Sequence, residues 1–335
     1  MINRRQFIRN CAVGGAGVIL QDVRAAQNSK SEINLPAIMN GAKKSRVVTA
    51  QRDDIFDHDA INSKAVSALL DQLLQSLFTE NSDFIWKSLF KPNDTVGIKV
   101  NCLAGRGMST HPELVEAIIE RLQQAGIPSN HIIVWDRHDR DLERAGFKLN
   151  QGGHKVQCYG SNRTGFTQEL YEFGFAASLL SRILTDQCTA MINVPILKDH
   201  GIVGMSGALK NNFGMINNPN KYHDNLGDPY VADVAMLSPI RQKTRLIICD
   251  CLQPQYEGGP PYMPQWTWKM NSLMAAVDPV AHDQIGWQII EEKRLEMGFP
   301  SLAEVGRESG YIATAAGPNY QVGTNDPEKI EWLHV

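Results

Sequence analysis

Residues 193–214 read NVPILKDHGIVGMSGALKNNFG. The segment begins as an apolar run of the kind that forms a buried strand, and it continues directly into Lys198, His200, four glycines and Lys210. Its last part, SGALKN (206–211), has the pattern of the first turn of a helix. This order predicts a buried strand, a glycine-rich turn and a helix start, with ionisable side chains gathered where the strand ends.

The same alternation of apolar runs and helical patterns extends along most of the chain. Residues 63–78 carry apolar side chains at i, i+3 and i+4 spacing, which is typical of an amphipathic helix. Further helices are expected from Pro112 to Gly126, from about Gln168 to Leu184, from near Ser206, and from Asp278 to about Met297. The expected strands are TVGIKV (95–100), HIIVWD (131–136), KVQCYG (155–160), TAMINVP (189–195), RLIICD (245–250) and SLMAAV (272–277). Apolar strands that alternate with helices predict an α/β fold with a mostly parallel, doubly wound, Rossmann-like sheet covered by helices on both faces.

Ligands of such sheets bind beyond the carboxyl ends of the strands. Polar residues that follow the apolar runs are therefore the candidate site residues, and they are Lys99, Asn101, Arg106, His138, Lys198, His200 and Lys210. Each of them alone has an ordinary structural explanation, such as a helix cap or a solvated loop. Because several of them follow different strands, we expect them to line one cleft.

The residue types in the 193–214 segment favour an anionic ligand. Gly201, Gly204 and Gly207 let the backbone approach a ligand closely, and a helix start near residue 206 favours a negative charge. Lys198 and Lys210 add positive charge, and a histidine such as His200 can exchange a proton near neutral pH or bind a metal. The alternative is a solvated Lys210 and a loop histidine that bonds to a backbone carbonyl.

The amino-terminal residues 1–25 have the layout of a cleavable export signal, in which arginines precede a short apolar run and small residues. The sequence Arg4-Arg5-Gln6-Phe7 resembles a twin-arginine signal. Twin-arginine substrates cross the membrane folded, so this signal predicts a periplasmic protein, contact with the twin-arginine translocase, and a metal or organic cofactor loaded before export. The apolar run has ten residues, whereas a helix needs ~20 to cross a bilayer, so no permanent membrane anchor is expected.

Composition limits the other function classes. The formal net charge of −3 becomes −6 without residues 1–25, which carry four arginines and one aspartate, so no nucleic-acid partner is expected. Five of the six cysteines remain, and none of them forms a Cys-x-x-Cys pair, so an iron–sulfur cluster is not expected. One or two disulfides are expected in an oxidising compartment, but Cys249 and Cys251 lie in an apolar run and are interpreted as core residues.

The domain plan follows from these patterns. Residues 26–50 are polar and lack periodicity, so they are interpreted as a linker or irregular arm. Residues 51–335 are expected to form the α/β domain, either as one unit or as two lobes at about 51–190 and 191–335.

Several motifs resemble one bacterial family in the same order along the chain. They are VGIKVN (96–101), the 193–214 segment, YEGGP (256–260) and DPVAHD (278–283), and they resemble domain-of-unknown-function family 362, DUF362. This resemblance covers about two thirds of the chain and implies the fold.

A second resemblance is to the amino-terminal domain of the nickel-pincer lactate racemase family. It is carried by LAGRGMSTHPELVEAIIERLQQAGIPSNHIIVWDRHDR (103–140) and HGIVGMSGALK (200–210). It implies Arg106 as a substrate or cofactor-phosphate contact, His138 and His200 as an acid/base pair, and Lys210 as the cofactor-bearing lysine. His223 would be the metal ligand, with His200 as a second candidate ligand. The sequence departs from the racemase pattern around Arg106, in the spacing of His223 from Lys210, and in length.

Two functional hypotheses follow. The first is an exported, metal- or cofactor-dependent enzyme that acts on a small anionic, carboxylate-type substrate by proton or hydride transfer, with Lys99, Asn101, Arg106, Lys198 and Gly207 holding ligand or cofactor. The second is a non-catalytic periplasmic protein that binds a metal or an anion in the same cleft. The tract of residues 254–270, rich in proline and aromatic residues, is interpreted as a lid with a hinge at Gly258 and Gly259.

Overall fold

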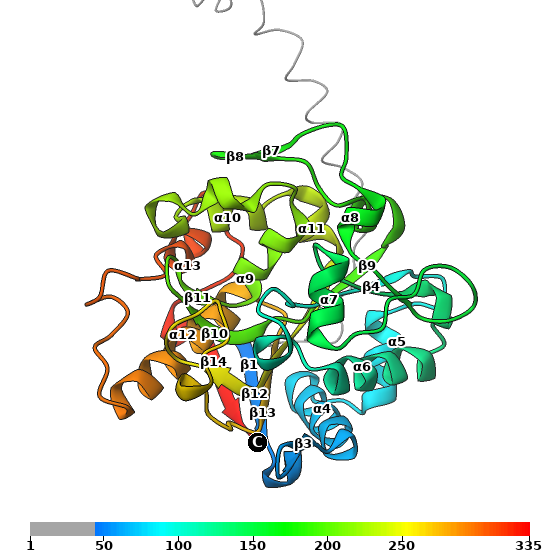
Figure 1. Ribbon diagram of the computed structural model, residues 1–335, viewed down its shortest axis with the longest axis horizontal. Helices are drawn as coiled ribbons and strands as arrows, with labels where there is room; N and C mark the ends of the chain where they lie inside the picture. The colour runs from blue at the N-terminus through cyan, green and yellow to red at the C-terminus, as the bar shows by residue number, and fades with distance from the viewer. Residues whose placement is uncertain (1–43) are drawn as a thin grey trace, which may run out of the picture. The chain divides into compact units, whose positions relative to one another are not determined.

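Two parallel strand pairings at the centre of one sheet organise the fold (Figure 1). The computed structural model describes residues 44–335. Strand β9 (Ala190–Asn193) pairs in parallel with β4 (Val96–Lys99) on one side and with β12 (Thr244–Gln255) on the other. Every side chain of β4 and β9 is buried, as expected for strands that are covered on both faces.

Within residues 44–335 the sheet has ten strands in the order β14-β1-β13-β12-β9-β4-β5-β6, with β10 beside β12 and β11 beside β10. Its other strands are β1 (Ser45–Gln51), β5 (Ile132–Trp135), β6 (Gln157–Cys158), β10 (Ile196–His200), β11 (Gly204–Ser206), β13 (Ser272–Ala276) and β14 (Ile330–His334). Only β1·β13, β12·β13 and β10·β11 are antiparallel among the pairings of this sheet in residues 44–335. The predicted mostly parallel α/β sheet is confirmed, although the strand expected at 272–277 runs antiparallel to both neighbours.

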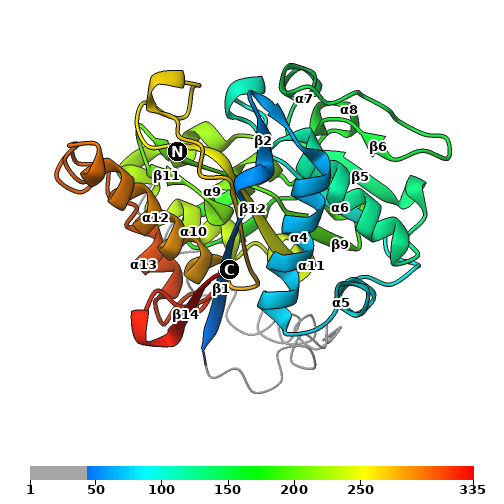
Figure 2. The ribbon, with the colours of Figure 1, turned by 90° about the horizontal axis from the view of Figure 1, so that it is seen from below.

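Helices cover both faces of the sheet. Figure 2 shows β1 and β12 between α4 (Ser63–Phe78) on one side and α12 (Pro279–Glu296) on the other, and both helices contact β1 and β13. The remaining α-helices are α5 (Ser82–Leu89), α6 (Pro112–Gln124), α7 (Asp139–Ala145), α8 (Ser161–Thr164), α9 (Ala208–Asn211), α10 (Tyr230–Ala235), α11 (Ser238–Lys243) and α13 (Tyr311–Ala316). The helices predicted from residues 63, 112 and 278 are confirmed. None of the described helices is long and apolar enough to span a membrane.

Helix starts are fixed by side chains that accept hydrogen bonds from free backbone N–H groups. The Asn62 side chain accepts from the N–H groups of Lys64 and Ala65 at the start of α4. Asp278 does the same for Val280 and Ala281 at the start of α12. These caps explain why both helices begin where the sequence pattern places them.

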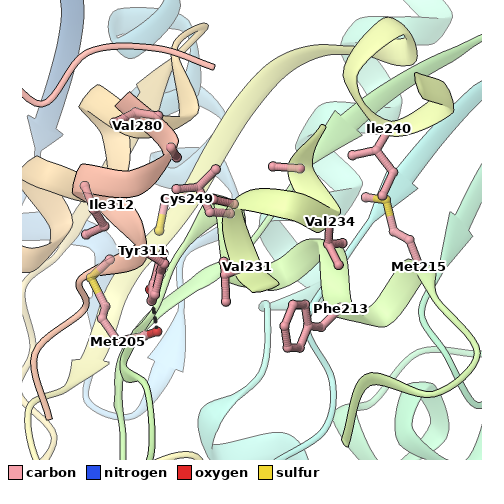
Figure 3. Close-up of a cluster of buried hydrophobic side chains, with 14 of the residues drawn as sticks. Met205, Phe213, Met215, Val231, Val234, Ile240, Cys249, Val280, Tyr311 and Ile312 are labelled. Carbon is pink, nitrogen blue, oxygen red and sulfur yellow. Dashed lines mark hydrogen bonds between the residues drawn. The ribbon is translucent and has the colours of Figure 1, made fainter. Parts of the chain in front are cut away.

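The core on the α12 side of the sheet joins sheet and helices that are distant in sequence (Figure 3). It includes Cys249 of β12, Val280 of α12, Val231 of α10 and Tyr311 of α13. The Tyr311 hydroxyl donates a hydrogen bond to the Met205 carbonyl, 3.0 Å away, so this buried phenol is satisfied. Phe213 belongs to this cluster and also lines the cavity that holds the polar residues described below.

Residues 168–184 do not form the predicted helix. They contain a hairpin of β7 (Tyr171–Phe173) and β8 (Ala176–Ser178), followed by a short π-helical segment, Ile183–Gln187. Gly174 turns the chain with φ of 56°, and the N–H of Phe175 donates to an Asp233 carboxylate oxygen at 2.8 Å. Tyr171 and Phe173 pack on the core as alternate residues of a strand, which is a period-2 pattern rather than a helical one.

Other expectations differ in detail. Residues 45–50, assigned to an irregular arm, belong to β1, which is held between β13 and β14. The rest of that arm and the export signal lie outside the described residues. The helix expected from Ser206 is only the four-residue α9, which continues into a 3-10 turn. The five cysteines of the described chain are buried and free, so the expected disulfides are absent there, while the core assignment of Cys249 and Cys251 is confirmed.

The possible division into two lobes near residue 190 stays a prediction. The sheet is continuous there, because β9 bonds to strands on both sides of that position.

Candidate functional site

The chain order of the strands reverses beside β4. β5 and β6 extend the sheet from one side of β4, and β9 and β12 extend it from the other. Connections on either side of such a switch point leave a crevice at the carboxyl ends of the strands. A cavity of about 570 Å³ lies there, bordered by residues that follow β4 and β5 and by residues in and after β10.

Most of the predicted site residues line this cavity. They are Lys99, Asn101, His138, Lys198, His200, Lys210 and His223. Five basic side chains, Lys99, Arg137, Arg140, Lys198 and Lys210, face the cavity with two acidic ones, Asp136 and Asp141. The lining therefore carries an excess of positive charge when its lysines are protonated, which favours an anionic ligand.

Both carboxylates are already paired, Asp141 with Arg140 and Asp136 with Lys99. Lys99 Nζ lies 2.8 Å from Asp136 Oδ1, and both side chains are nearly inaccessible to solvent. Asp136 also accepts hydrogen bonds from the backbone N–H groups of Cys102 and Arg137. Gly214 makes room for the pair, because a Cβ atom there would stand 2.5 Å from Lys99 Nζ and 2.9 Å from Asp136 Oδ1. This pair fixes the floor of the cavity and leaves little of its charge for a ligand.

Lys198 and Lys210 are buried without such compensation. Lys198 Nζ donates to Asn101 Oδ1 and to the Met108 carbonyl, both at 3.2 Å. Lys210 Nζ lies 4.1 Å from the centre of the Phe213 ring. Within residues 44–335 neither lysine forms an ion pair. Burial lowers the pKa of Lys198 to about 8, and burial together with the charge of Lys198 lowers the pKa of Lys210 to about 7.

The backbone fixes the tautomer of His200. Its Nδ1 atom accepts hydrogen bonds from the N–H groups of Ile202 at 3.2 Å and Val203 at 3.4 Å. Nδ1 therefore has no proton of its own, and the neutral ring carries its proton on Nε2. Burial, then the charges of Lys210 and His223, lowers the pKa of His200 to about 2, so the ring is neutral at ordinary pH. His200 thus offers the cavity a neutral N–H donor.

His223 has the opposite tautomer. Its Nδ1 lies 3.1 Å from the Pro219 carbonyl oxygen and 3.3 Å from that of Asn220, so Nδ1 donates and Nε2 keeps a lone pair. The ring stacks on His200 with centroids 5.5 Å apart and an interplanar angle of 29°. Burial, followed by the charge of Lys210, lowers the pKa of His223. The two stacked rings therefore supply one hydrogen-bond donor, His200 Nε2–H, and one proton acceptor, His223 Nε2.

Two predicted contacts lie elsewhere. Arg106 is exposed, and its guanidinium group lies beside Gly146 at the end of α7 instead of lining the cavity. Gly207 also stands outside the lining, and the backbone that follows it is already occupied. The Asp283 carboxylate accepts hydrogen bonds from Ala208 N at 2.6 Å and Leu209 N at 3.0 Å. The chain's own carboxylate thus fills the helix start that the sequence suggested for a ligand.

This carboxylate is a positioning residue to which the sequence reasoning gave no role. Asp283 is fully buried, and His282 Nδ1 lies 2.8 Å from its Oδ1 atom. A Cβ at position 207 would stand 2.4 Å from Asp283 Oδ1, so only glycine lets the carboxylate approach. The DPVAHD and SGALK motifs therefore meet in space, and their contact holds the short helix that carries Lys210.

Phe213 is a second residue that the sequence reasoning missed. It contacts Lys210 from three residues further along the chain, and its ring also meets His223 edge-on at 5.5 Å. The only signal in the sequence was the Lys-x-x-Phe spacing, which places both side chains on one side of a helical turn.

The mouth of the cavity is partly apolar. Leu103 is 61% exposed and Ile202 is 48% exposed, and both line the cavity with Pro260. The neighbouring Gly259 accepts a hydrogen bond from Gly201 N and donates one to Asp199 Oδ1. The 254–270 tract thus borders the site, and its motion as a lid stays a prediction.

The predicted metal ligands, His200 and His223, lie close to each other, but two ligands alone do not make a metal site. Within residues 44–335, no group of three or more His, Cys, Asp or Glu side chains is placed to hold a metal ion. The acid/base pair implied by the sequence was His138 and His200. His138 lines the cavity from the start of α7, but the ring that stacks on His200 is that of His223.

Comparisons with known proteins agree with the motifs. The family described as domain of unknown function (DUF362) matches residues 96–288, which include β4, β5, β9, β10 and α9. No curated protein matches the sequence.

Two solved structures are similar. One is the lactate racemase apoprotein from Thermoanaerobacterium thermosaccharolyticum, with 10% identity, a TM-score of 0.43, and coverage of 75% of this chain and 58% of that chain. The other is a protein from Thermotoga maritima, with 12% identity, a TM-score of 0.37, and coverage of 73% and 61% respectively. The chain spans less than two thirds of each.

Proposed function

The chain belongs to the DUF362 family, and from the geometry of its cavity we propose that it is an enzyme that binds a small anionic, carboxylate-type molecule and moves a proton on it. The observation that carries this proposal is the burial of Lys198 and Lys210 without an ion-pair partner in the described chain. A buried ammonium group without a counter-ion is costly, and a carboxylate in the cavity would remove that cost.

The stacked histidines support catalysis rather than binding alone. His200 Nε2–H can donate a hydrogen bond to a ligand oxygen, and a neutral imidazole with a low pKa polarises such an oxygen without giving up its proton. His223 Nε2 can accept a proton from a neighbouring atom. A ligand carboxylate would offset the charge of Lys210, which is one cause of the low pKa of His223, and so would strengthen His223 as a base. His138 remains a candidate for a second proton-transfer role.

The residues fit the nickel-pincer cofactor only in part. Lys210 faces the cavity, but Arg106, which would contact its phosphate, does not. The proton on His200 Nε2 leaves that atom without a lone pair for a metal, so His223 alone offers one. We therefore assign the reaction to side chains of this chain and derive no step through that cofactor.

Export by the twin-arginine route and a periplasmic location belong to the same proposal. The supporting feature is the Arg4-Arg5 motif before a short apolar run, which lies outside the described residues. The translocase would then meet a folded chain whose cavity is already formed.

Calorimetric titration with lactate, glycerate, malate and tartrate tests the binding step. We expect at least one of them to bind, and Lys198→Met to weaken that binding by at least ~10-fold, because the variant loses a charged contact. Lys87→Met, which removes an exposed lysine far from the cavity, is the matched control and should bind as the wild type does. Equal affinity in the wild type and Lys198→Met, or no binding of any of the four acids, would refute the proposal.

Proton transfer is tested separately by NMR in deuterated water. The bound acid should exchange the hydrogen on the carbon next to its carboxylate, and His223→Gln should lose the exchange by at least ~100-fold while keeping most of the affinity. Binding without exchange in the wild type would instead identify a non-catalytic anion-binding protein.

A further inference from the structure

Lys210 has the surroundings of a nucleophile. Its side chain is 9% exposed, it opens into the cavity, and its nitrogen rests on the face of Phe213. Within the described residues it donates no hydrogen bond to an oxygen atom and forms no ion pair. An amine in such a place is uncharged for part of the time near neutral pH, and an uncharged amine attacks carbonyl carbons.

Helix α9, which carries Lys210, is held in place by buried hydrogen bonds from other parts of the chain. The Asp283 carboxylate bonds to two N–H groups at the start of α9, and Asn193 Nδ2 donates to the Ala208 carbonyl at 2.8 Å. These buried contacts fix the backbone of a four-residue helix that would not be stable alone. The amine is therefore presented to the cavity from a rigid support, which nucleophilic catalysis requires.

We propose that Lys210 forms an imine with the carbonyl carbon of a small oxo-carboxylate, such as a 2-oxo acid. This inference rests on the proposed function, because the same cavity must first hold the carboxylate. Lys198 is the contact for that carboxylate, with Arg137 and Arg140 contributing positive charge to the same lining. The carbonyl group then faces Lys210 and the stacked histidines.

The step balances with groups that line the cavity. The neutral Lys210 nitrogen forms a bond to the carbonyl carbon while the carbonyl oxygen accepts a hydrogen bond from His200 Nε2–H. The attacking nitrogen then gives a proton to His223 Nε2, and this proton goes to the oxygen to give a carbinolamine. Loss of the hydroxyl group and the second nitrogen proton as one water leaves the C=N bond. No oxidant, reductant or metal is consumed.

Reductive trapping tests the proposal. The full chain is incubated with pyruvate and sodium cyanoborohydride, and intact-mass and peptide analyses locate any added reduced pyruvate unit. We expect one such unit per chain, on Lys210, and a loss of at least ~10-fold in Lys210→Arg, because a guanidinium group does not attack a carbonyl. Lys87→Arg is the matched control and should keep the adduct on Lys210.

A second measurement does not depend on the folding of the variant. Excess lactate, which has the carboxylate but no carbonyl, should slow trapping on the wild-type chain by at least ~10-fold by occupying the cavity. An adduct that is spread over surface lysines, or that is equally strong in Lys210→Arg, would overturn the imine.

Calorimetry with lactate and pyruvate separates the two claims. If both acids bind and no adduct forms, the imine is wrong and the anion cavity stands. If neither acid binds and no adduct forms, the imine with pyruvate is wrong, and the four-acid titration decides whether the anion cavity falls with it.

Discussion

Lys210 works against the stability of the fold. Its pKa is about 7 in the folded chain, whereas an exposed lysine in the unfolded chain titrates near the ordinary value of 10.5. Between these two pH values the folded state binds fewer protons than the unfolded state, so stability falls as the pH drops from about 10 toward 7. Below pH 7 the full cost of burying the charge is present.

Replacing this lysine should therefore stabilise the protein. We expect Lys210→Met to raise the free energy of unfolding at pH 7 by about 1–3 kcal/mol, since a similar apolar volume replaces a desolvated ammonium group. The gain should shrink at pH 10, where the wild-type amine is neutral. Urea denaturation at both pH values measures it, with Lys87→Met as a control that should shift by less than ~0.5 kcal/mol. A less stable Lys210→Met at pH 7 would contradict the burial argument.

For single residues, the sequence predicted which side chains lie in the site better than it predicted the direction or the tautomer of each side chain. Lys99, Lys198 and His200 could be placed together because the carboxyl ends of parallel strands meet at one edge. Arg106 could not, because the direction of a side chain in a loop depends on packing that the sequence does not display. The tautomers of the two histidines depend on single backbone N–H and carbonyl groups, which no pattern of residue types records.

At the scale of single elements, helix α9 depends on Asp283, which lies 75 positions along the chain from Ala208 in the first turn of the helix. Asp283→Asn keeps the shape of the side chain but places an amide nitrogen against one of the two N–H groups that it now accepts. We expect a loss of about 1–3 kcal/mol in the free energy of unfolding, since a buried charged acceptor is removed. Asp326→Asn, which changes a cap on an exposed turn, should cost less than ~1 kcal/mol. Equal losses for the two variants would show that Asp283 does not hold α9.

The 254–270 tract is the element most suited to follow ligand binding. It borders the cavity through Pro260, and Tyr262 is 39% exposed in it. If it closes as a lid, saturating lactate should slow chymotrypsin cleavage after Tyr262 by at least ~3-fold, because closure lowers local opening. Tryptic cleavage at the exposed Lys155 should not change. Equal rates of cleavage after Tyr262 with and without ligand would show that the tract is a fixed wall.

Helices were predicted correctly from the sequence where the local signals all favoured a helix. Residues 63–78 have an uninterrupted helical pattern of apolar residues, and residues 279–296 follow the cap residue Asp278 and begin with a proline; both helices were predicted almost to their ends. The 168–184 region failed because its apolar residues also fit a hairpin, and the contact between Asp233 and the Phe175 N–H is made by a residue 58 positions later. A periodic pattern in a short stretch of sequence does not predict a contact with a residue so far along the chain.

For the whole molecule, the parallel half of the sheet followed from strand and helix alternation. The other half did not, because β1 lies between β13 and β14, which come from the far end of the chain. Arg46 and Glu331, which pair across β1 and β14, are 285 positions apart. Strand pairings between the two ends of the chain form only when the whole domain folds, so they leave no periodic signal in the sequence.

The proposed export would act on the whole folded chain. Arg4→Lys together with Arg5→Lys keeps the charge of the signal but removes the arginine pair, and we expect the precursor to stay in the cytoplasm. Cell fractionation measures the distribution. Arg9→Lys is the matched control, and we expect this variant and the wild type to reach the periplasm alike. Normal periplasmic accumulation of the double variant would refute the twin-arginine route.

The central claim is that the cavity lined by Lys198 and Lys210 binds a carboxylate, and the proton balance of binding tests it most directly. The ionisable groups that line the cavity with Lys210 are Lys99, Lys198, His138, His200, His223, Arg137, Arg140, Asp136 and Asp141. Burial lowers the pKa values of His200 and His223, so these two rings are neutral at pH 8, and the protons taken up on binding should go to Lys198 and Lys210. A bound carboxylate should raise the pKa of Lys210 above about 7 and that of Lys198 above about 8.

Calorimetry of lactate binding in buffers of different ionisation enthalpy gives the number of protons taken up. We predict about one proton at pH 8, little uptake at pH 6, and an affinity that falls by at least ~10-fold from pH 6 to pH 9. In Lys210→Met the uptake at pH 8 should drop to the smaller share that belongs to Lys198. Binding that takes up no proton at pH 8 and keeps the same affinity from pH 6 to pH 9 would contradict the account.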